Sequence, residues 1–420
     1  MNNFIHNGKI VSPDDEVLTQ AILQECYQKG IRPICACLPQ KNIEMYIAKI
    51  GENFVLKRMP NSADQHDFSC LSYEPPTEIS GLGEVIGEAI KTDETGASVL
   101  KFEFSLSKSN VSKQAPTPSD TPKDTVKAET TKLTLKGTLD YLLEEALLNR
   151  HQPNMKHNWF QFRKALKVAL NDKKNKKDDL SGLVYIPEYY DQTKHNEIEA
   201  RRKAELADLK VKGNKRPLKI FIGVIKSIED ARFDGGRIIL KHAPTLHLFM
   251  DAKMYSRVNK RFEAELEQAH YQDDVNLLAI GTFGFADSGI AKIEEIALVP
   301  LNQTWLPFES LGEKELLDTL TMQNRSFIKC LRYNLSPKSP IANVLLTDTN
   351  PPTAFYLIND QTEDSYITEA KELIASSEFT SILVNVDRDV VDIPPPENKP
   401  LLGYNLSLIH ISEPTRLLSI

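Results

Sequence analysis

The chain has 420 residues, of which 41% are hydrophobic and 26% are charged, and its formal net charge is −7. This composition is typical of a folded protein with room for two or three domains, and it excludes a chain that coats nucleic acid with general positive charge. No apolar run approaches the length of a membrane span, and the first residues lack the plan of a signal peptide. Five cysteines do not make a disulfide framework, so we expect reduced thiols, a cytoplasmic location and no membrane partner.

The first predicted element is an amphipathic helix over residues 14–29. Ser12-Pro13-Asp14-Asp15 is a helix start signal, and Gly30 is a stop signal. Apolar residues recur between them at helical spacing, and Cys26 is one of them. This spacing predicts that Cys26 is a core residue and not a metal ligand.

Two runs rich in Ile, Val, Phe and Tyr follow, Ile43–Ile50 and Asn53–Met59. Gly51 between them indicates a hairpin with a tight turn. A turn centred on this position places Cys37 opposite His66 across the open end of the hairpin.

Three cysteines and one histidine therefore gather at this end of the hairpin: Cys35, Cys37, His66 and Cys70. Thiolate and imidazole are the ligands that tetrahedral zinc prefers, and four protein ligands close the coordination sphere, so the pattern predicts structural and not catalytic zinc. Two other interpretations stay open. The cysteines could be small buried hydrophobes with His66 in a loop, or one of them could be a redox or catalytic thiol.

Residues 1–106 are expected to form this zinc-hairpin domain, which ends in a strand at Val99–Leu106. The three glycines between Gly81 and Gly87 suggest a dinucleotide-binding motif, but Pro75-Pro76 stands where that motif needs a strand. Residues 107–131 contain three prolines, no aromatic residue and many Ser, Thr and Lys residues. Such a segment cannot bury apolar surface, so it is predicted to be a disordered linker.

Residues 132–216 are predicted to be helical and basic, with helices at about 134–150 and 158–172. Nine Lys and Arg residues lie between Asn149 and Lys177, against one acidic residue. Two helices with a basic second helix resemble a helix-turn-helix DNA reader in outline. The alternative is a solvated lysine-rich face with a mobile loop at 172–179. The candidate nucleic-acid contacts are Arg150, Lys156, Arg163, Lys164 and Lys167.

Residues 217–305 are expected to contain two hairpins with a helix between them. The predicted elements are strands at Leu218–Ser227 and Arg237–Lys241, a helix at Asp251–His270, and strands at Val275–Phe285 and Ile290–Pro300.

Residues 306–396 follow the order helix, strand, strand, strand, helix, strand. This is the core order of restriction-endonuclease-like nucleases, which hold Mg²⁺ with an acid beside the second strand and an acid and a lysine on the third. Asp348 is a candidate for the first acid, and Glu309 or Glu313 for an acid on the leading helix. The third strand, TAFYLIN, supplies neither a carboxylate nor a lysine, so an active metal site is not predicted.

The last segment is interpreted as foreign to the protein. Residues 406–416, LSLIHISEPTR, match the translation of a common sequencing-library adapter. We therefore interpret residues 406–420 as an adapter-derived tail.

Several strings identify the chain as similar to one bacterial family. They include RPICAC, MYIAKIGENFVLKRMP, SGLGEVIGEAI, TWLPFES and VLLTDTNPPTAFYLI. The chain resembles the bacterial domain-of-unknown-function 1173 family over most of residues 1–395. The resemblance implies a setting on plasmids and integrative elements, and no assigned activity.

These observations together predict an α+β protein with a zinc-pinned hairpin domain, a helical pair and a mixed α/β C-terminal region. The function they favour is that of a non-enzymatic, zinc-containing, DNA- or RNA-associated accessory protein of mobile elements. A nuclease and a protein-binding scaffold are the alternatives.

Overall fold

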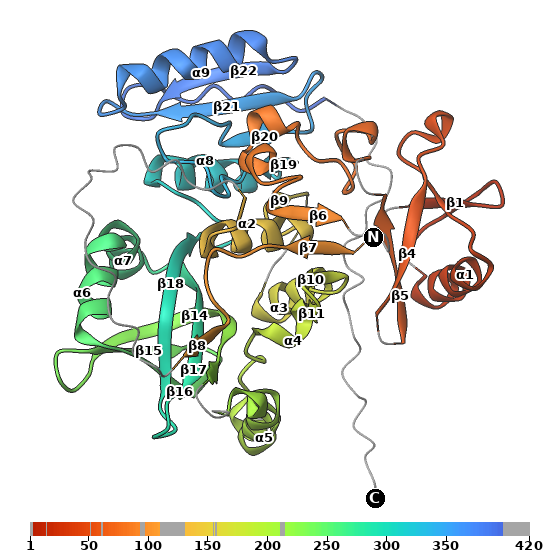
Figure 1. Cartoon of the computed structure of the whole chain (residues 1–420). Helices are drawn as coiled ribbons and strands as arrows, with labels where there is room; N and C mark the ends of the chain where they lie inside the picture. The colour runs from red at the N-terminus through yellow and green to blue at the C-terminus, as the bar shows by residue number, and fades with distance from the viewer. Residues whose placement is uncertain are drawn as a thin grey trace, which may run out of the picture.

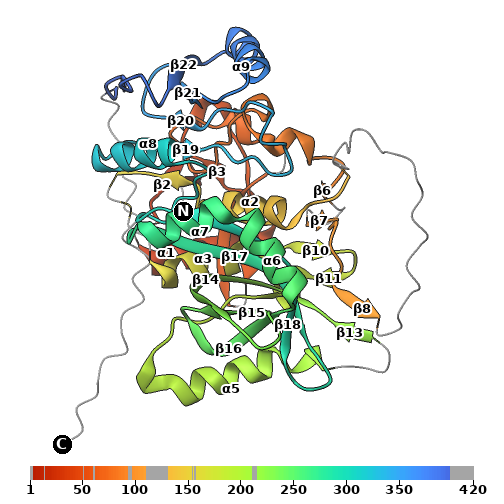
Figure 2. The ribbon, with the colours of Figure 1, turned by 90° about the vertical axis from the view of Figure 1, so that its left-hand side faces the viewer.

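The fold is known from a computed structural model that describes residues 3–13, 15–50, 52–59, 62–92, 97–109, 131–153, 155, 158–210 and 215–397. It is a mixed α+β structure, as the sequence predicts. Figures 1 and 2 show the C-terminal sheet at the top, a barrel at the bottom and the helices α2 and α3 between them. The adapter-like segment 406–420 lies outside the described residues. In the described part of the chain, no helix is both long and apolar enough to cross a membrane.

The N-terminal region consists of small elements around one hairpin. Helix α1 (Glu16–Lys29) begins at Asp15, whose carboxylate accepts the N–H of Leu18, and ends at Gly30 in the left-handed conformation. Cys26 is buried in this helix, as predicted. The strands of the region are β1 (Phe4–His6), β2 (Lys9–Val11), β3 (Ile34–Cys35), β4 (Met45–Ile50), β5 (Asn53–Arg58), β6 (Ile90–Thr92), β7 (Ser98–Leu100) and β8 (Ser107–Ser109).

The hairpin has the predicted register. Strands β4 and β5 pair antiparallel, with Met45 opposite Arg58 and Ile50 opposite Asn53. Extended beyond the ends of the strands, the same register predicts that Cys37 faces His66.

The strands at the end of the N-terminal region pair with later parts of the chain. Strand β7 pairs with β10 (Lys173–Asn175), and β8 pairs with β13 (Lys215–Pro217). The predicted ends of the segments 1–106 and 132–216 therefore lie beside or within paired strands. Strand β10 also pairs with β11 (Asp178–Asp179), so the alternative of a mobile loop at 172–179 is wrong. Most of the expected linker, residues 110–130, lies outside the described residues.

The helical pair is not a helix-turn-helix. Helices α2 (Leu135–Glu145) and α3 (Trp159–Ala169) are separated by residues 146–158, which contain strand β9 (Arg150–His151). A DNA-reading pair needs a turn of about three or four residues, so the predicted outline is wrong in this respect. Helices α4 (Leu180–Leu183) and α5 (His195–Glu205) complete this region.

Residues 217–305 build a closed five-stranded barrel. Its strands are β14 (Lys219–Asp230), β15 (Gly236–Leu240), β16 (Ala243–Met250), β17 (Asn276–Phe285) and β18 (Ala291–Leu301). They follow the order β14-β15-β16-β18-β17, and β17 pairs back with β14 to close the ring. Helices α6 (Ala252–Arg261) and α7 (Glu263–Tyr271) connect β16 to β17. A five-stranded barrel with such crossed connections belongs to the Greek-key class that includes the OB-fold.

Strand β16 is the one element of the barrel that we did not predict. Its alternation of inward Leu246, Leu248 and Met250 with outward residues was the available signal. Pro244 near its start obscured this signal, because proline is disfavoured within strands. A short strand β12 (Val184–Tyr185) extends the sheet beside β14.

The C-terminal unit has the predicted helix and strand order. It consists of α8 (Leu311–Met322), β19 (Phe327–Lys329), β20 (Val344–Leu346), β21 (Thr353–Ile358), α9 (Asp364–Ser376) and β22 (Thr380–Asn385). Its sheet has the order β22-β21-β20-β19-β9, so β9 of the helical region adds the fifth strand.

Both faces of this sheet are covered. Phe327, Val344 and Phe355 share a core cluster with the leucines of α8. The alternate residues Leu345 and Tyr356 share another cluster with the N-terminal region. The N-terminal region therefore packs on this face of the C-terminal sheet, with contacts from the segment that follows the hairpin.

Candidate metal centre

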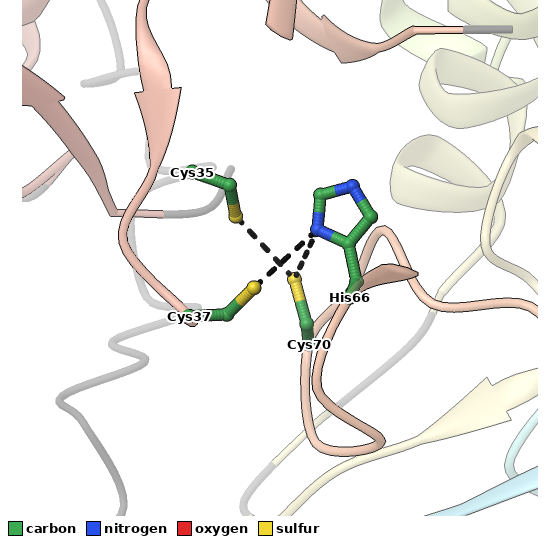
Figure 3. Close-up of side chains that lie close together, drawn as sticks. All are labelled: Cys35, Cys37, His66 and Cys70. Atoms are coloured by element: carbon green, nitrogen blue, oxygen red, sulfur yellow. Dashed lines mark hydrogen bonds between the residues drawn. The ribbon is translucent and has the colours of Figure 1, made fainter. Parts of the chain in front are cut away.

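The four predicted ligands converge at the open end of the hairpin. Strand β3 ends at Cys35, whose N–H donates to the carbonyl of Ile43. His66 directly follows a 3-10 turn at Ala63–Gln65. The N–H of Cys70 donates to the carbonyl of Asp67 in a tight turn. Figure 3 shows the four side chains pointing toward one another.

The distances fit one tetrahedral ion. The Sγ atoms of Cys35 and Cys70 are 3.7 Å apart, and His66 Nδ1 lies 3.4 Å from Cys37 Sγ and 3.6 Å from Cys70 Sγ. The ligand atoms all lie within 4.8 Å of one another. Zinc–sulfur bonds of about 2.3 Å at the tetrahedral angle separate two sulfurs by about 3.8 Å. The cluster could therefore bind a metal ion, and it is the one such group of His, Cys, Asp and Glu side chains in the described part of the chain.

The polar surroundings favour one thiolate, that of Cys37. The side chains of Cys35 and Cys70 hydrogen-bond to Cys37 and lower its pKa, against the effect of burial and with help from His66. The same hydrogen bond from Cys35 to Cys37 raises the pKa of Cys35 to about 12. Backbone N–H groups also point at the sulfurs, as in the 3.4 Å contact from Ser72 N to Cys70 Sγ. One thiolate is thus favoured without a metal, and a cation is required to ionise all three.

The centre is joined to the C-terminal sheet by packing. Cys35 and Cys70 belong to the same core cluster as Leu345 and Tyr356. The ring of Phe68, between His66 and Cys70, contacts the ring of Phe379 at a centroid distance of 6.3 Å. A metal ion bound here would lie where the N-terminal region meets the sheet.

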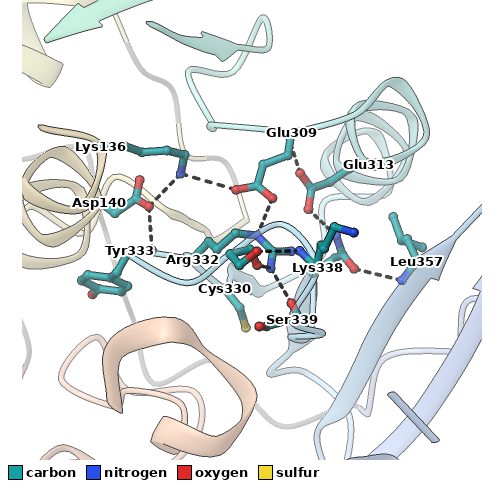
Figure 4. Close-up of polar contacts among 12 residues, drawn as sticks. Lys136, Asp140, Glu309, Glu313, Cys330, Arg332, Tyr333, Lys338, Ser339 and Leu357 are labelled. Carbon is teal, nitrogen blue, oxygen red and sulfur yellow. Dashed lines mark hydrogen bonds and ion pairs between the residues drawn. The ribbon is translucent and has the colours of Figure 1, made fainter. Parts of the chain in front are cut away.

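Asp348 and Glu309, two of the three candidate nuclease acids, are bound in separate ion pairs. Both oxygens of Asp348 accept hydrogen bonds of 2.8 Å from the guanidinium of Arg325. Glu309 accepts a 2.9 Å hydrogen bond from Arg332 and forms an ion pair with Lys136 (Figure 4). These ion pairs hold structural segments together, so neither carboxylate is available to a metal ion as the structure stands.

The charges around Glu309 also explain its ionisation. Burial favours the neutral carboxyl, but the positive charges of Lys136, Lys329 and Arg332 lower the pKa of Glu309 to about 2. Glu313, in the first turn of α8, accepts the N–H of Glu309, which precedes the helix, and the side-chain amide of Asn343. It therefore has a capping role at the start of α8.

The predicted nucleic-acid contacts are dispersed by the fold. Arg150 is only 3% exposed and binds Glu144 and the carbonyl of Leu71, so a phosphate cannot reach it and the prediction is wrong for this residue. Lys156 lies outside the described residues. The other three lie on α3, where Arg163 donates to the carbonyl of Ile186 and faces Glu188, Lys167 faces Glu205, and Lys164 is exposed.

Lys173 of the basic segment is buried and has a structural role. Its ammonium lies 2.6 Å from a carboxylate oxygen of Glu145, at the end of α2. Burial alone would raise the pKa of Glu145, but the charges of Lys173 and Arg58 lower it to about 2. Since the folded pKa lies below the unfolded value, this carboxylate stabilises the protein above pH 4.5 and the stabilisation is lost as the pH falls towards 2.

We therefore expect Glu145→Gln to destabilise the protein at neutral pH by an amount on the order of 3 kcal/mol. The difference in unfolding free energy between parent and variant should shrink as the pH is lowered from 4.5 to 2. Urea unfolding at a series of pH values measures this difference. A difference that does not change with pH would contradict the assigned ion pair.

Comparison with known proteins gives one match. The family model described as "Protein of unknown function (DUF1173)" matches residues 6–384. No curated protein and no solved structure matches the chain. The match covers the metal cluster, the barrel and nearly all of the C-terminal sheet, so this chain belongs to the DUF1173 family.

Proposed function

We propose that Cys35, Cys37, His66 and Cys70 hold one structural zinc ion in a non-enzymatic accessory protein that associates with nucleic acid. The observation that carries the metal assignment is the convergence of three sulfurs and one imidazole nitrogen within 4.8 Å. Soft thiolate ligands with one imidazole favour zinc over magnesium or calcium, which prefer oxygen.

The closed ligand set supports a structural and not a catalytic ion. Four protein ligands leave no position for water or substrate. The core cluster around Cys35 and Cys70 extends to the C-terminal sheet. The ion would then hold the N-terminal region on that sheet, in place of a large hydrophobic core of its own. Free thiols in this arrangement fit a reducing compartment, so we place the protein in the cytoplasm.

Association with nucleic acid is supported by the barrel more than by the basic helix α3. Five-stranded barrels of the OB class bind oligonucleotides on one face. The mobile-element setting rests on the family resemblance. A nuclease is the weaker candidate, because Asp348 and Glu309 are bound in separate ion pairs.

The test of the metal assignment is the metal content of the full chain. Protein purified without added chelator should carry one zinc per chain, and Cys37→Ser and His66→Ala should each reduce this content strongly. The cobalt-substituted protein should show the visible absorption of a tetrahedral thiolate centre. Cys330→Ser, at a buried cysteine outside the cluster, is the matched control and should retain the metal. Metal-free parent protein that binds no added zinc would overturn the assignment.

A further inference from the structure

We propose that single-stranded nucleic acid binds across the outer face of the barrel, which we define by Arg237, Ile239, His247, Phe249 and Lys292. This barrel face lies on three neighbouring strands, β15, β16 and β18 (Figure 1). The proposal rests on the nucleic-acid association proposed above and names the surface and the type of nucleic acid.

The pairing of the strands places an aromatic ring between two cations. Phe249 on β16 pairs with Arg237 on β15 and with Lys292 on β18. All three side chains are partly exposed, while their chain neighbours Ile238, Leu248 and Ile293 point into the barrel and are buried. A base can stack on such a ring while the flanking cations meet phosphates, which is how sequence-tolerant single-strand binding works.

A second row lies beside the first. His247 pairs with Ile239 on β15, and the rings of His247 and Phe249 contact each other at a centroid distance of 6.4 Å. Two rings on one strand, two residues apart, offer consecutive stacking positions for two bases.

The β14–β15 turn adds an exposed aromatic residue at the end of the barrel face. Phe233 is 93% exposed and has a φ of 61°, and Asp234 follows with a φ of 57°. Two positive φ angles define a turn that favours Asn and Gly, so a bulky phenylalanine is costly there. Its exposure gains no packing in return. A role in binding accounts for a residue that folding disfavours.

The ion pairs on the barrel face do not prevent phosphate binding. Arg237 pairs with Glu229 at 2.6 Å, and Lys292 pairs with Asp251 at 3.1 Å. All four side chains are more than a third exposed, and such surface pairs contribute only about 0–1 kcal/mol. A phosphate can therefore compete for either cation.

The same features argue against duplex DNA as the main ligand. The bases of a duplex are stacked on one another and hide their faces from an aromatic side chain. The structure also lacks, among its described residues, the short turn of a helix-turn-helix between α2 and α3. Exposed rings on a barrel suit unpaired bases.

The experiment titrates the full-length, metal-loaded protein against a fluorescein-labelled oligothymidylate, the same-length RNA and a duplex, at two salt concentrations. Phe233→Ala combined with Phe249→Ala should weaken binding to the single strands by roughly 30-fold or more, because each of the two stacked bases contributes about 1–3 kcal/mol. Phe249→Trp should retain binding, since it keeps a stacking ring. Arg237→Ala and Lys292→Ala should each lower the salt slope by about 0.7.

The matched control is Phe160→Ala, the same change at an exposed phenylalanine on α3, outside the barrel. It should leave affinity unchanged, and thermal unfolding of every variant checks that the fold is intact. If the parent binds neither single strands nor duplex at low salt, the proposed nucleic-acid association itself fails. If the parent binds but the two phenylalanine changes have no effect, or if Lys164→Ala with Lys167→Ala abolishes binding instead, the association stands and the barrel face is wrong.

Discussion

Removing the proposed zinc ion from the cysteine–histidine centre should lower the unfolding free energy of the full chain by several kcal/mol, since structural zinc contributes an apparent folding free energy of about 10–16 kcal/mol in zinc-finger peptides. Without the ion, three sulfurs and an imidazole remain together in a buried site where only one thiolate is favoured. The N-terminal region then loses its attachment near the C-terminal sheet, and its small strands have little core of their own. Calorimetry of zinc-loaded and chelator-treated protein measures the loss.

The Cys70→Ser variant should show the same loss without chelator, and adding zinc should not restore it. Hydrogen exchange should locate the change in β3, β4 and β5 and in the strands of the C-terminal sheet that share a core cluster with the N-terminal region, while the barrel keeps its protection. Cys26→Ser is the control, because Cys26 contacts His6 and lies outside the cluster. Equal melting temperatures for loaded and stripped protein would show that the site has no structural role.

Breaking the ion pair between Glu313 and Lys329, in the C-terminal unit, should also lower the unfolding free energy of the full chain. Their charged atoms are 3.0 Å apart, and the two side chains are 0% and 2% exposed. Lys329→Met leaves the carboxylate of Glu313 buried without its cation, which costs about 3–5 kcal/mol. Chemical unfolding of the full chain measures the change.

A double variant tests whether the loss of stability comes from the unpaired charge of Glu313. Lys329→Met combined with Glu313→Gln removes both charges, and it should recover part of the stability because no unpaired charge remains. Glutamine can still accept the N–H of Glu309, as Glu313 does. Lys338→Met is the matched control, since it breaks an exposed pair with Glu363 and should cost less than about 1 kcal/mol. A Lys329→Met variant as stable as the control would refute the assigned role.

Local sequence patterns determined the metal centre. The two apolar runs predict the hairpin register, and extending that register beyond the strands predicts that Cys37 faces His66; their side chains lie 3.4 Å apart. Helix α1 was predicted from equally local signals, since its start and stop residues and its apolar spacing lie within one short segment. Such features depend on neighbours along the chain and so can be predicted from it.

Tertiary structure decided which charged side chains are buried in ion pairs and which are exposed. Nine basic residues in one segment suggested a binding surface, but charge patterns do not show which side chains are covered by distant segments. Arg150 became the buried partner of Glu144, and Lys173 that of Glu145. Asp348 likewise binds Arg325 across two chain segments.

The barrel also depended on long-range pairing. Four of its five strands could be predicted one by one from their apolar runs, yet closure requires β17 to pair back with β14 across more than fifty residues of chain. The separate parallel pairing of β16 with β18 places Lys292 beside Phe249, and the antiparallel pairing of β15 with β16 places Arg237 on the other side. Local propensity determined the strands and the metal ligands of this protein, while the non-local contacts that bury one charge and expose another determined which surface is available for binding.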